Sequence, residues 1–193
     1  GDVFGYVEQK ESVDFAQAVE LLADKYHIEL AYEDTGHSTR QRQGSTRARL
    51  LEVCEQTQKF FVTQLNTDEA LAARKLLAGR NFTQSDCERF GCGYAPQAWD
   101  TLVRYLADRG YTQQEMVDAG VARRGQNNSV YDYFRGRATW PIRDSTGRTL
   151  GFGARKLYDD DKVAAKYINT PDTALYHKNQ MLYGIDIAKP NIV

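Results

Sequence analysis

The pattern of apolar and polar residues divides the chain into a helical first half and a strand-forming second half. Apolar residues between Ser12 and Tyr26 recur at the spacing of one helix face, and Ser12 is a suitable N-cap. Residues 31–46 are polar and aperiodic, which is typical of a loop or linker. A longer stripe predicts a second helix over 46–65, with a buried face made of Leu50, Leu51, Val53, Cys54, Thr57, Phe60, Phe61 and Leu65.

Shorter helices are expected to follow at about 67–79, 83–90, 97–109 and 112–119. Gly79 is a natural C-cap for the first of them. Thr112 and Glu115 have the spacing of a capping box, and Gly120 is placed to end that helix. The region up to about residue 130 is therefore predicted to be built mainly of helices joined by loops.

Alternating and β-forming residues dominate the last third of the chain. RATWPIR (137–143) and TLGFGARKLY (149–158) predict two strands, and DSTGR (144–148) predicts a tight turn between them, with Gly147 at positive φ. YINT (167–170) predicts a third, short strand. The expected fold class is α+β, a helical N-terminal half followed by a small mixed β-sheet with a basic hairpin.

Composition places the chain among ordinary globular proteins. Its 193 residues are 41% hydrophobic and 26% charged, enough to bury a core without disulfides or metal. It has no apolar run long enough to cross a membrane, and the N-terminal residues lack the pattern of a signal peptide. These features predict a cytoplasmic protein.

The net charge of −1 conceals two regions of opposite sign. Residues 1–36 hold nine acidic and two basic side chains, whereas residues 133–156 hold six basic side chains and one acidic side chain. A local basic field on a nearly neutral chain favours phosphate binding, and the alternative is a solvated hairpin.

Few residues have the pattern of a catalytic or metal site. Cys54, Cys87 and Cys92 do not have zinc-ligand spacing, so isolated reduced thiols are expected. The three histidines are scattered, no acidic cluster suits Mg²⁺, and phosphate-binding glycine motifs and a nucleophile elbow are absent from the sequence. We therefore predict no catalytic residue and no metal ligand within this chain.

What remains is a set of residues that suits a polyanion. Arg135 and Arg137 are predicted to share one face of the first strand, with Arg143 on the same face and Arg155 on the returning strand. Arginine grips phosphate bidentately, and a tyrosine such as Tyr167 offers a flat surface to a nucleobase. The alternative gives each cation a surface ion pair and places Tyr167 half in the core. Core packing is expected for Trp99 and Trp140.

Several of these segments together resemble bacterial DnaG-type DNA primases. The similar segments are FRGRATWPIRDSTGRTLGFGAR (134–155), KYINTPDT (166–173) and YHKNQMLYGI (176–185), preceded by ERFGCGYAPQAWDTL (88–102) and VDFAQAVELLADKYHIEL (13–30). They occur in the family's order and cover nearly the whole chain. Several motifs in register make the resemblance specific.

The resemblance implies a fragment of the primase RNA-polymerase core. Residues 1–36 resemble an acidic helical start after an absent zinc-binding domain, 37–130 the helical part of the core subdomain, and 131–193 the basic β-rich part leading to an absent Toprim domain. Mg and Zn are then expected in the parent, in those flanking domains, and none in this fragment. The implied partners are single-stranded DNA template, RNA–DNA hybrid, nucleoside triphosphates and, through an absent C-terminal domain, the replicative helicase.

By motif match, the resemblance also implies a nucleic-acid and nucleotide-binding set. Its members are Arg80, Arg135, Arg137, Arg143, Arg155, Lys166, Tyr167, Asn169 and Lys178. Departures from the family are Thr170 and Asp172, in place of serine and glutamate, and Tyr133, where an arginine is common. Residues 159–162 lengthen the loop before Lys166.

Three functions remain open from the sequence. The first is a fragment of DNA primase, the enzyme that synthesises short RNA primers for DNA replication, with the isolated fragment inactive because the metal site lies elsewhere. The second is a stand-alone single-stranded nucleic-acid-binding module with no catalytic role. The third is a helical protein–protein adaptor whose hairpin charges are incidental.

Overall fold

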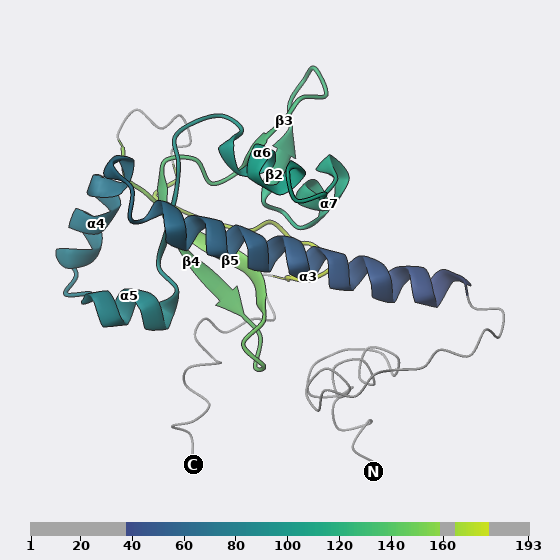
Figure 1. Ribbon diagram of the computed structural model, residues 1–193, viewed down its shortest axis with the longest axis horizontal. Coiled ribbons are helices and arrows are strands. Elements are labelled where there is room, and N and C mark those ends of the chain that lie inside the picture. Colours follow the sequence, from purple (N-terminus) through teal and green to yellow (C-terminus); the bar gives the residue numbers. More distant parts are fainter. Residues whose placement is uncertain (1–37, 159–164, 178–193) are drawn as a thin grey trace, which may run out of the picture. The chain divides into compact units, whose positions relative to one another are not determined.

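The structure, a computed structural model, describes residues 38–158 and 165–177 (Figure 1). The chain divides into two compact units, Gly1–Thr46 and Arg47–Val193, and packing is described here for the second. Its helices are the long α3 (Ser38–Gln64) and then η1 (Asp68–Ala70), α4 (Leu71–Ala78), α5 (Gln84–Phe90), α6 (Thr101–Ala107) and α7 (Gln113–Asp118). The helix predicted over 12–26 and the loop residues 159–162 lie outside the described residues.

The helix α3 begins earlier than the apolar pattern predicts, because residues 38–46 of the expected loop are helical. These residues include arginines and glutamines, whose helix propensity is close to that of leucine, so polarity alone does not exclude a helix. From residue 47 onward the predicted buried stripe is confirmed, with Val53 and Cys54 wholly buried and Leu51 half-buried.

The predicted helix ends are set by local capping. Thr112 accepts from the backbone N–H of Glu115, whose carboxylate accepts in return from the N–H of Thr112, which confirms the capping box of α7. Thr83 and Asp86 form a second capping box on α5. Gly120 has φ of +72° just beyond α7, as its predicted role requires.

Four strands form the main sheet in the order β1 (Gly93–Ala95), β4 (Arg137–Arg143), β5 (Thr149–Lys156) and β6 (Tyr167–Asn169). Every pairing is antiparallel, whereas a mixed sheet was expected, because the connections between neighbouring strands bring the chain back in the opposite direction. A separate ribbon pairs β2 (Ala122–Arg124) with β3 (Val130–Asp132). The turn between β4 and β5 is closed by Gly147 at φ +87°, as predicted.

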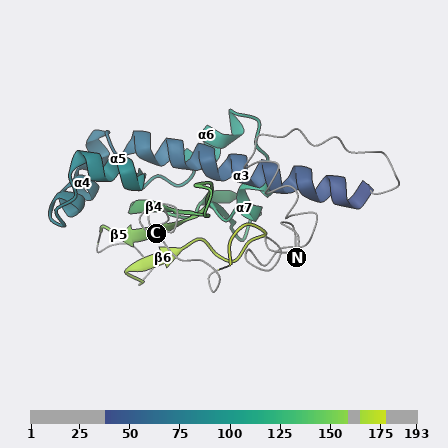
Figure 2. The ribbon, with the colours of Figure 1, turned by 90° about the horizontal axis from the view of Figure 1, so that it is seen from below.

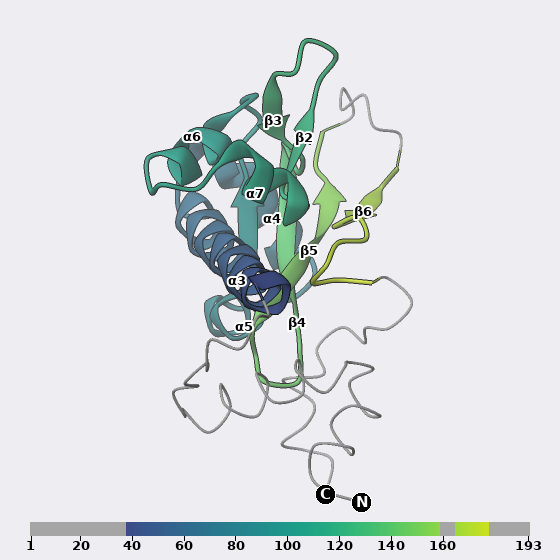
Figure 3. The same ribbon diagram turned by 90° about the vertical axis from the view of Figure 1, so that its right-hand side faces the viewer.

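Two apolar clusters take opposite faces of the main sheet. Phe61 of α3 packs edge-on against Phe152 of β5, in the larger cluster that also holds residues of α6 and α7. Tyr94 and Ala138 point the other way, into a smaller cluster with Leu77 of α4. Figures 2 and 3 show the helices gathered on the β4 side of the sheet and β6 at its outer edge. The edge strand β6 is therefore the part of the sheet left most open.

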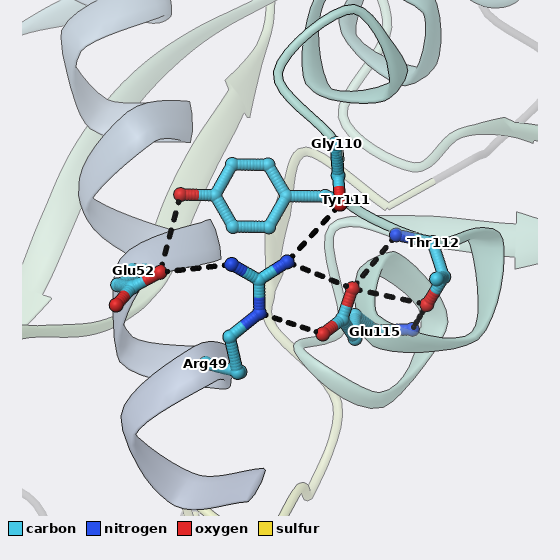
Figure 4. Close-up of polar contacts among 6 residues, drawn as sticks. All are labelled: Arg49, Glu52, Gly110, Tyr111, Thr112 and Glu115. Atoms are coloured by element: carbon cyan, nitrogen blue, oxygen red, sulfur yellow. Dashed lines mark hydrogen bonds and ion pairs between the residues drawn. The ribbon is translucent and has the colours of Figure 1, made fainter. Parts of the chain in front are cut away.

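A polar joint holds α7 against α3 (Figure 4). The Nε of Arg49 donates to Glu115 at 2.9 Å, and its Nη1 donates to Glu52 at 3.1 Å. Its Nη2 donates to the carbonyl of Gly110, and its guanidinium carbon lies 4.5 Å from the centre of the Tyr111 ring. One arginine thus fixes the loop and cap that begin α7.

Candidate nucleic-acid interface

The edge strand β6 presents an exposed aromatic ring between two arginines. Tyr167 is 52% exposed, although packing partly in the core was one reading of the sequence. Arg155 lies directly opposite it on β5, with its guanidinium carbon 5.9 Å from the ring centre. Arg80, in the turn after α4, donates from Nη2 to the phenolic oxygen at 2.9 Å. Three distant segments of the chain thus meet at one ring.

The cations around Tyr167 also act on its phenol. The hydrogen bond from Arg80 lowers the pKa of the Tyr167 hydroxyl below its ordinary value, and the charges of Arg80, Arg155 and Lys166 act in the same direction. Lys166 is exposed next to the ring. The site is therefore a positive surface with a flat aromatic centre.

Arg155 has donors that the surrounding protein does not use. Its Nε and Nη1 atoms are buried, and neither has a hydrogen-bond partner among the described residues. Across β4 its neighbour is Ala138, whose methyl group offers no acceptor. Buried guanidinium donors are normally satisfied, so these two are an exception within the described residues.

A groove of about 600 Å³ adjoins the ring. Tyr167 and Asn169 line it from β6, Thr170 to Asp172 line it further along the chain, and Tyr133 contributes a second aromatic side chain. Asn169 lies opposite Gly153 of β5, where no side chain competes for the space above the sheet. The predicted residues Lys166, Tyr167 and Asn169 are therefore brought together with Arg80 and Arg155.

The face that Arg135 and Arg137 were predicted to share does not exist. Arg137 is only 1% exposed and donates to the carbonyl of Ala165 at 3.2 Å, so it anchors the chain that leads into β6. Arg135 precedes the strand, and Gly136 at φ +63° breaks the alternation between the two arginines. The predicted shared face required extended backbone at residues 135–136, which precede β4.

Arg143 lies at the far end of β4. It is five residues beyond Ala138, the partner of Arg155, which is roughly 17 Å along an antiparallel strand. Its register is shifted by an irregularity after Ile142, and its Nη2 lies close to Gly91. The structure therefore does not bring Arg143 to the Tyr167 surface, and Lys178 lies outside the described residues.

Trp99 belongs to a second aromatic and cationic cluster that the sequence analysis missed. Its indole is 53% exposed and stacks on Tyr131 with ring centres 4.5 Å apart, although core packing was expected. Arg135 lies over the same indole, 4.0 Å from its centre. The sequence carried no such signal, because Trp99 continues the apolar stripe of the helix predicted over 97–109, whereas α6 begins only at Thr101.

The two clusters lie near the same end of the β4–β5 pair. Gly136, which follows Arg135, lies against Gln97 and against Tyr158, just beyond the end of β5. The end of β5 also carries Arg155. Both aromatic and cationic clusters therefore lie at the same end of the β4–β5 pair.

Neither a metal site nor a membrane helix is found in the part of the chain that the structure describes. Within residues 38–158 and 165–177 no three histidine, cysteine, aspartate or glutamate side chains gather as metal ligands would. In the same residues no helix is long and apolar enough to span a membrane.

Comparison with known proteins gives a consistent result. Residues 60–189 match the family model described as "DNA primase catalytic core, N-terminal domain". The DNA primase of Mycolicibacterium smegmatis is 44% identical over the whole chain, which spans 30% of that relative's length. This chain thus corresponds to less than a third of such a protein.

Solved primase structures share the fold. The RNA polymerase domain of Mycobacterium tuberculosis primase DnaG, in complex with a double-stranded DNA oligomer with a 6-nucleotide overhang, has a TM-score of 0.73 at 43% identity. That match covers 75% of this chain and 45% of the other. A DnaG primase catalytic domain bound to ssDNA has a TM-score of 0.70 at 32% identity, covering 77% and 47%. Together with the motifs and the α+β fold, these matches show that the chain belongs to the DnaG-type DNA primase family, as the N-terminal domain of the catalytic core.

Proposed function

We propose that the surface around Tyr167 binds single-stranded DNA template within a primase that makes short RNA primers. The observation that carries this proposal is the arrangement of Arg80, Tyr167 and Arg155. An exposed ring is held by one arginine, and the other has buried donors without a protein acceptor. A phosphate oxygen is an acceptor that suits those donors, and a nucleobase suits the ring.

The groove beside the ring extends this surface toward a nucleotide. Asn169 offers both a donor and an acceptor to a sugar or a base edge. Tyr133 and Tyr167 give the groove two aromatic side chains. These properties support contacts to a template base or to part of an incoming nucleoside triphosphate.

The cluster of Trp99, Tyr131 and Arg135 provides a second stacking position at the same end of the sheet. A strand with flexible linkages between its bases can stack on successive aromatic platforms with arginines between them. The solved relative bound to ssDNA supports a nucleic-acid role for this family. We therefore assign the template path to the surface that carries both clusters.

Primer synthesis joins nucleoside triphosphates and needs metal-assisted phosphoryl transfer, which these described residues are not built to supply. We assign the metal-dependent step, the zinc site and the helicase contact to other parts of the parent protein. The short span of this chain relative to its relatives supports that division. Family membership favours this function over a stand-alone binding module.

The test measures binding of a fluorescent single-stranded oligonucleotide by fluorescence anisotropy at a series of salt concentrations. Each phosphate contact on a single strand changes the slope of log affinity against log salt by about −0.7. The combined Arg80, Arg155 and Lys166 to alanine variant is expected to lose affinity and to show a shallower slope. Unchanged affinity and slope in that variant would remove this surface from the template path.

A further inference from the structure

The end of α5 places two cysteines, Cys87 and Cys92, at the smaller apolar cluster that also holds Tyr94. Gly91 ends the helix at φ +64°, and the backbone N–H of Cys92 donates to the carbonyl of Cys87 at 2.8 Å. The N–H of Gly91 donates to the carbonyl of Glu88. This pair of bonds is a Schellman motif, which commonly brings the side chains at its two ends into contact.

The two cysteines are close enough to be joined by a disulfide. With the 2.8 Å bond between them, standard bond lengths keep their Cα atoms within roughly 6.7 Å. Disulfides occur at Cα separations of about 4.4–6.8 Å. The thiol of Cys87 and the indole of Trp140 both act on the pKa of the Cys92 thiol, so the three side chains are neighbours. The sequence analysis expected three isolated thiols, whereas the structure places Cys87 and Cys92 within disulfide range of each other.

The two sulfurs differ in access. Cys92 is 2% exposed, whereas Cys87 is half-buried. Both line a groove of about 410 Å³, walled by apolar side chains such as Val62 and Phe82. That volume admits a small reagent to Cys87. Cys54, in contrast, is wholly buried in the other cluster.

We propose that Cys87 and Cys92 form a thiol-redox pair that closes to a disulfide by exchange with a low-molecular-weight disulfide. The thiolate of Cys87 attacks one sulfur of the reagent, and the other sulfur leaves as a thiolate that takes up a proton. Cys92 then loses its proton and attacks the sulfur of Cys87, which releases the second thiol. Two protein thiols are oxidised and one reagent disulfide is reduced to two thiols.

The order of attack follows from the surroundings of the two sulfurs. Cys87 faces the groove and is the first to meet the reagent. Burial, followed by the neighbouring Cys87, raises the pKa of the Cys92 thiol to about 12, so its thiolate is scarce. Closure by Cys92 is therefore the slower step, and a mixed disulfide on Cys87 precedes it. The closed pair ties the end of α5 to the residue that leads into β1.

The experiment oxidises the native chain with glutathione disulfide over a series of redox poises, traps free thiols with a maleimide and measures intact mass. The expected product is lighter by two hydrogen atoms and has lost labelling at Cys87 and Cys92. Cys54→Ser is the matched control and should close equally well. Cys92→Ser should stop at the mixed disulfide. In a Trp99→Phe background, closure should also change the fluorescence of Trp140.

Three results would each overturn the proposal. One is that the native chain keeps the thiols of Cys87 and Cys92 reduced at every redox potential tested. Another is a mixed disulfide on Cys87 that never closes although Cys92 is present. The third is peptide mapping that finds the new disulfide on Cys54. A small circular-dichroism change on oxidation should accompany the expected product, since the Schellman geometry already holds the sulfurs together.

Discussion

The guanidinium of Arg80 donates a 2.9 Å hydrogen bond to the phenol of Tyr167, across 87 residues of sequence. The bond links the turn after α4 to the edge strand β6 and leaves the Tyr167 ring exposed. An arginine that orients a ring in this way can contact a phosphate with its remaining donors while the ring stacks on a base. The two residues are therefore expected to act on different parts of a bound strand.

Replacing Tyr167 should separate stacking from charge. Tyr167→Ala is expected to weaken binding of a single-stranded oligonucleotide by about 1–3 kcal/mol, with the salt slope unchanged, because a base loses its platform. Tyr167→Phe keeps the ring and should keep most of the affinity. Arg80→Ala should instead make the slope shallower by about 0.7. The measurement is fluorescence anisotropy across a salt series.

Arg109→Ala is the matched control for this series. Arg109 is an exposed arginine beyond α6 whose guanidinium rests on Tyr105, outside the proposed surface. It should leave affinity and slope as they are. If Arg109→Ala and Arg80→Ala changed the slope equally, the effect would report the general charge of the protein rather than a site.

Arg137 should behave as a structural residue. Its side chain is buried and holds the carbonyl of Ala165, just before β6. Arg137→Ala is expected to lower the free energy of unfolding by about 2–3 kcal/mol, because it removes hydrogen bonds made by a buried charge. Urea denaturation measures this loss. A variant of full stability with a shallower salt slope would instead return Arg137 to the binding surface.

The fate of Arg137 shows where sequence reasoning reached its limit. The segment 137–143 was predicted with the bounds that β4 has, so its alternating pattern was informative. Alternation fixes which residues share a face, but not which face the neighbouring elements cover. Arg137 looked like an exposed cation because its anchor, the Ala165 carbonyl, lies 28 residues away on a segment with no helical or strand period.

The contacts at Tyr167 could be predicted only in part for a similar reason. Lys166, Tyr167 and Asn169 are neighbours in sequence, and their residue types indicate nucleic-acid binding. The positions of Arg80 and Arg155 at the same ring depend on how α4 and β5 pack, which local patterns do not encode. Family resemblance supplied Arg80 and the strand pattern had already supplied Arg155, whereas Trp99 required the structure, because an isolated aromatic residue is usually part of a core.

The joint between Arg49 and Glu115 should make stability depend on acid pH. The hydrogen bond from Arg49 lowers the pKa of the Glu115 carboxyl to about 2, from an ordinary value of 4.5. A lowered pKa gives stability that is fully present above about pH 5 and is lost as the pH falls through about 2. Glu115→Gln should therefore be less stable than the parent at pH 7, and this difference should shrink toward pH 2.

Thermal denaturation of both proteins across this pH range measures the Glu115 effect. Glu88→Gln on α5 is the control, because Glu88 is exposed and its carboxylate accepts a hydrogen bond from Gln84 of the same helix. The Glu88→Gln variant should not reproduce the loss of stability that Glu115→Gln shows at pH 7. A Glu115→Gln difference that widened in acid would mean that the carboxylate does not hold the joint.

Asp132 should have the opposite effect on the pH dependence of stability, with stability falling as the pH rises. Burial raises the pKa of its carboxyl to about 6, even though the backbone N–H groups of Leu102 and Val103 donate to it. A raised pKa means that the folded state binds the proton more tightly, so this contribution to stability falls as the pH rises from about 4 to 6. The loss should be roughly 2–3 kcal/mol.

Asp132→Asn tests this directly, since an amide does not titrate. The variant should lack the decline between pH 4 and 6 that denaturant unfolding detects in the parent. It should also be less stable at pH 4, because the amide oxygen has to serve two N–H donors that a carboxyl shares between two oxygens. Parallel pH profiles for parent and variant would assign the titration to another group.

Replacing Arg155 should raise the stability of the fold and weaken its binding of the oligonucleotide. Its buried Nε and Nη1 donors find no partner among the described residues, which costs folding free energy. Arg155→Met keeps the length and apolar character of the side chain and removes those donors. The variant is expected to be more stable by about 1–2 kcal/mol in urea denaturation. It should bind the oligonucleotide more weakly, with a salt slope shallower by about 0.7.

The same pair of measurements separates this explanation from simple packing. Arg74 is the matched control, because its Nη1 donates to the carbonyls of Leu65 and Thr67 and its donors are therefore used within the fold. Arg74→Met should be less stable than the parent, and its affinity for the oligonucleotide should be unchanged. If Arg155→Met also lost stability, its donors would already be satisfied within the protein, and the case for a ligand phosphate at Arg155 would fail.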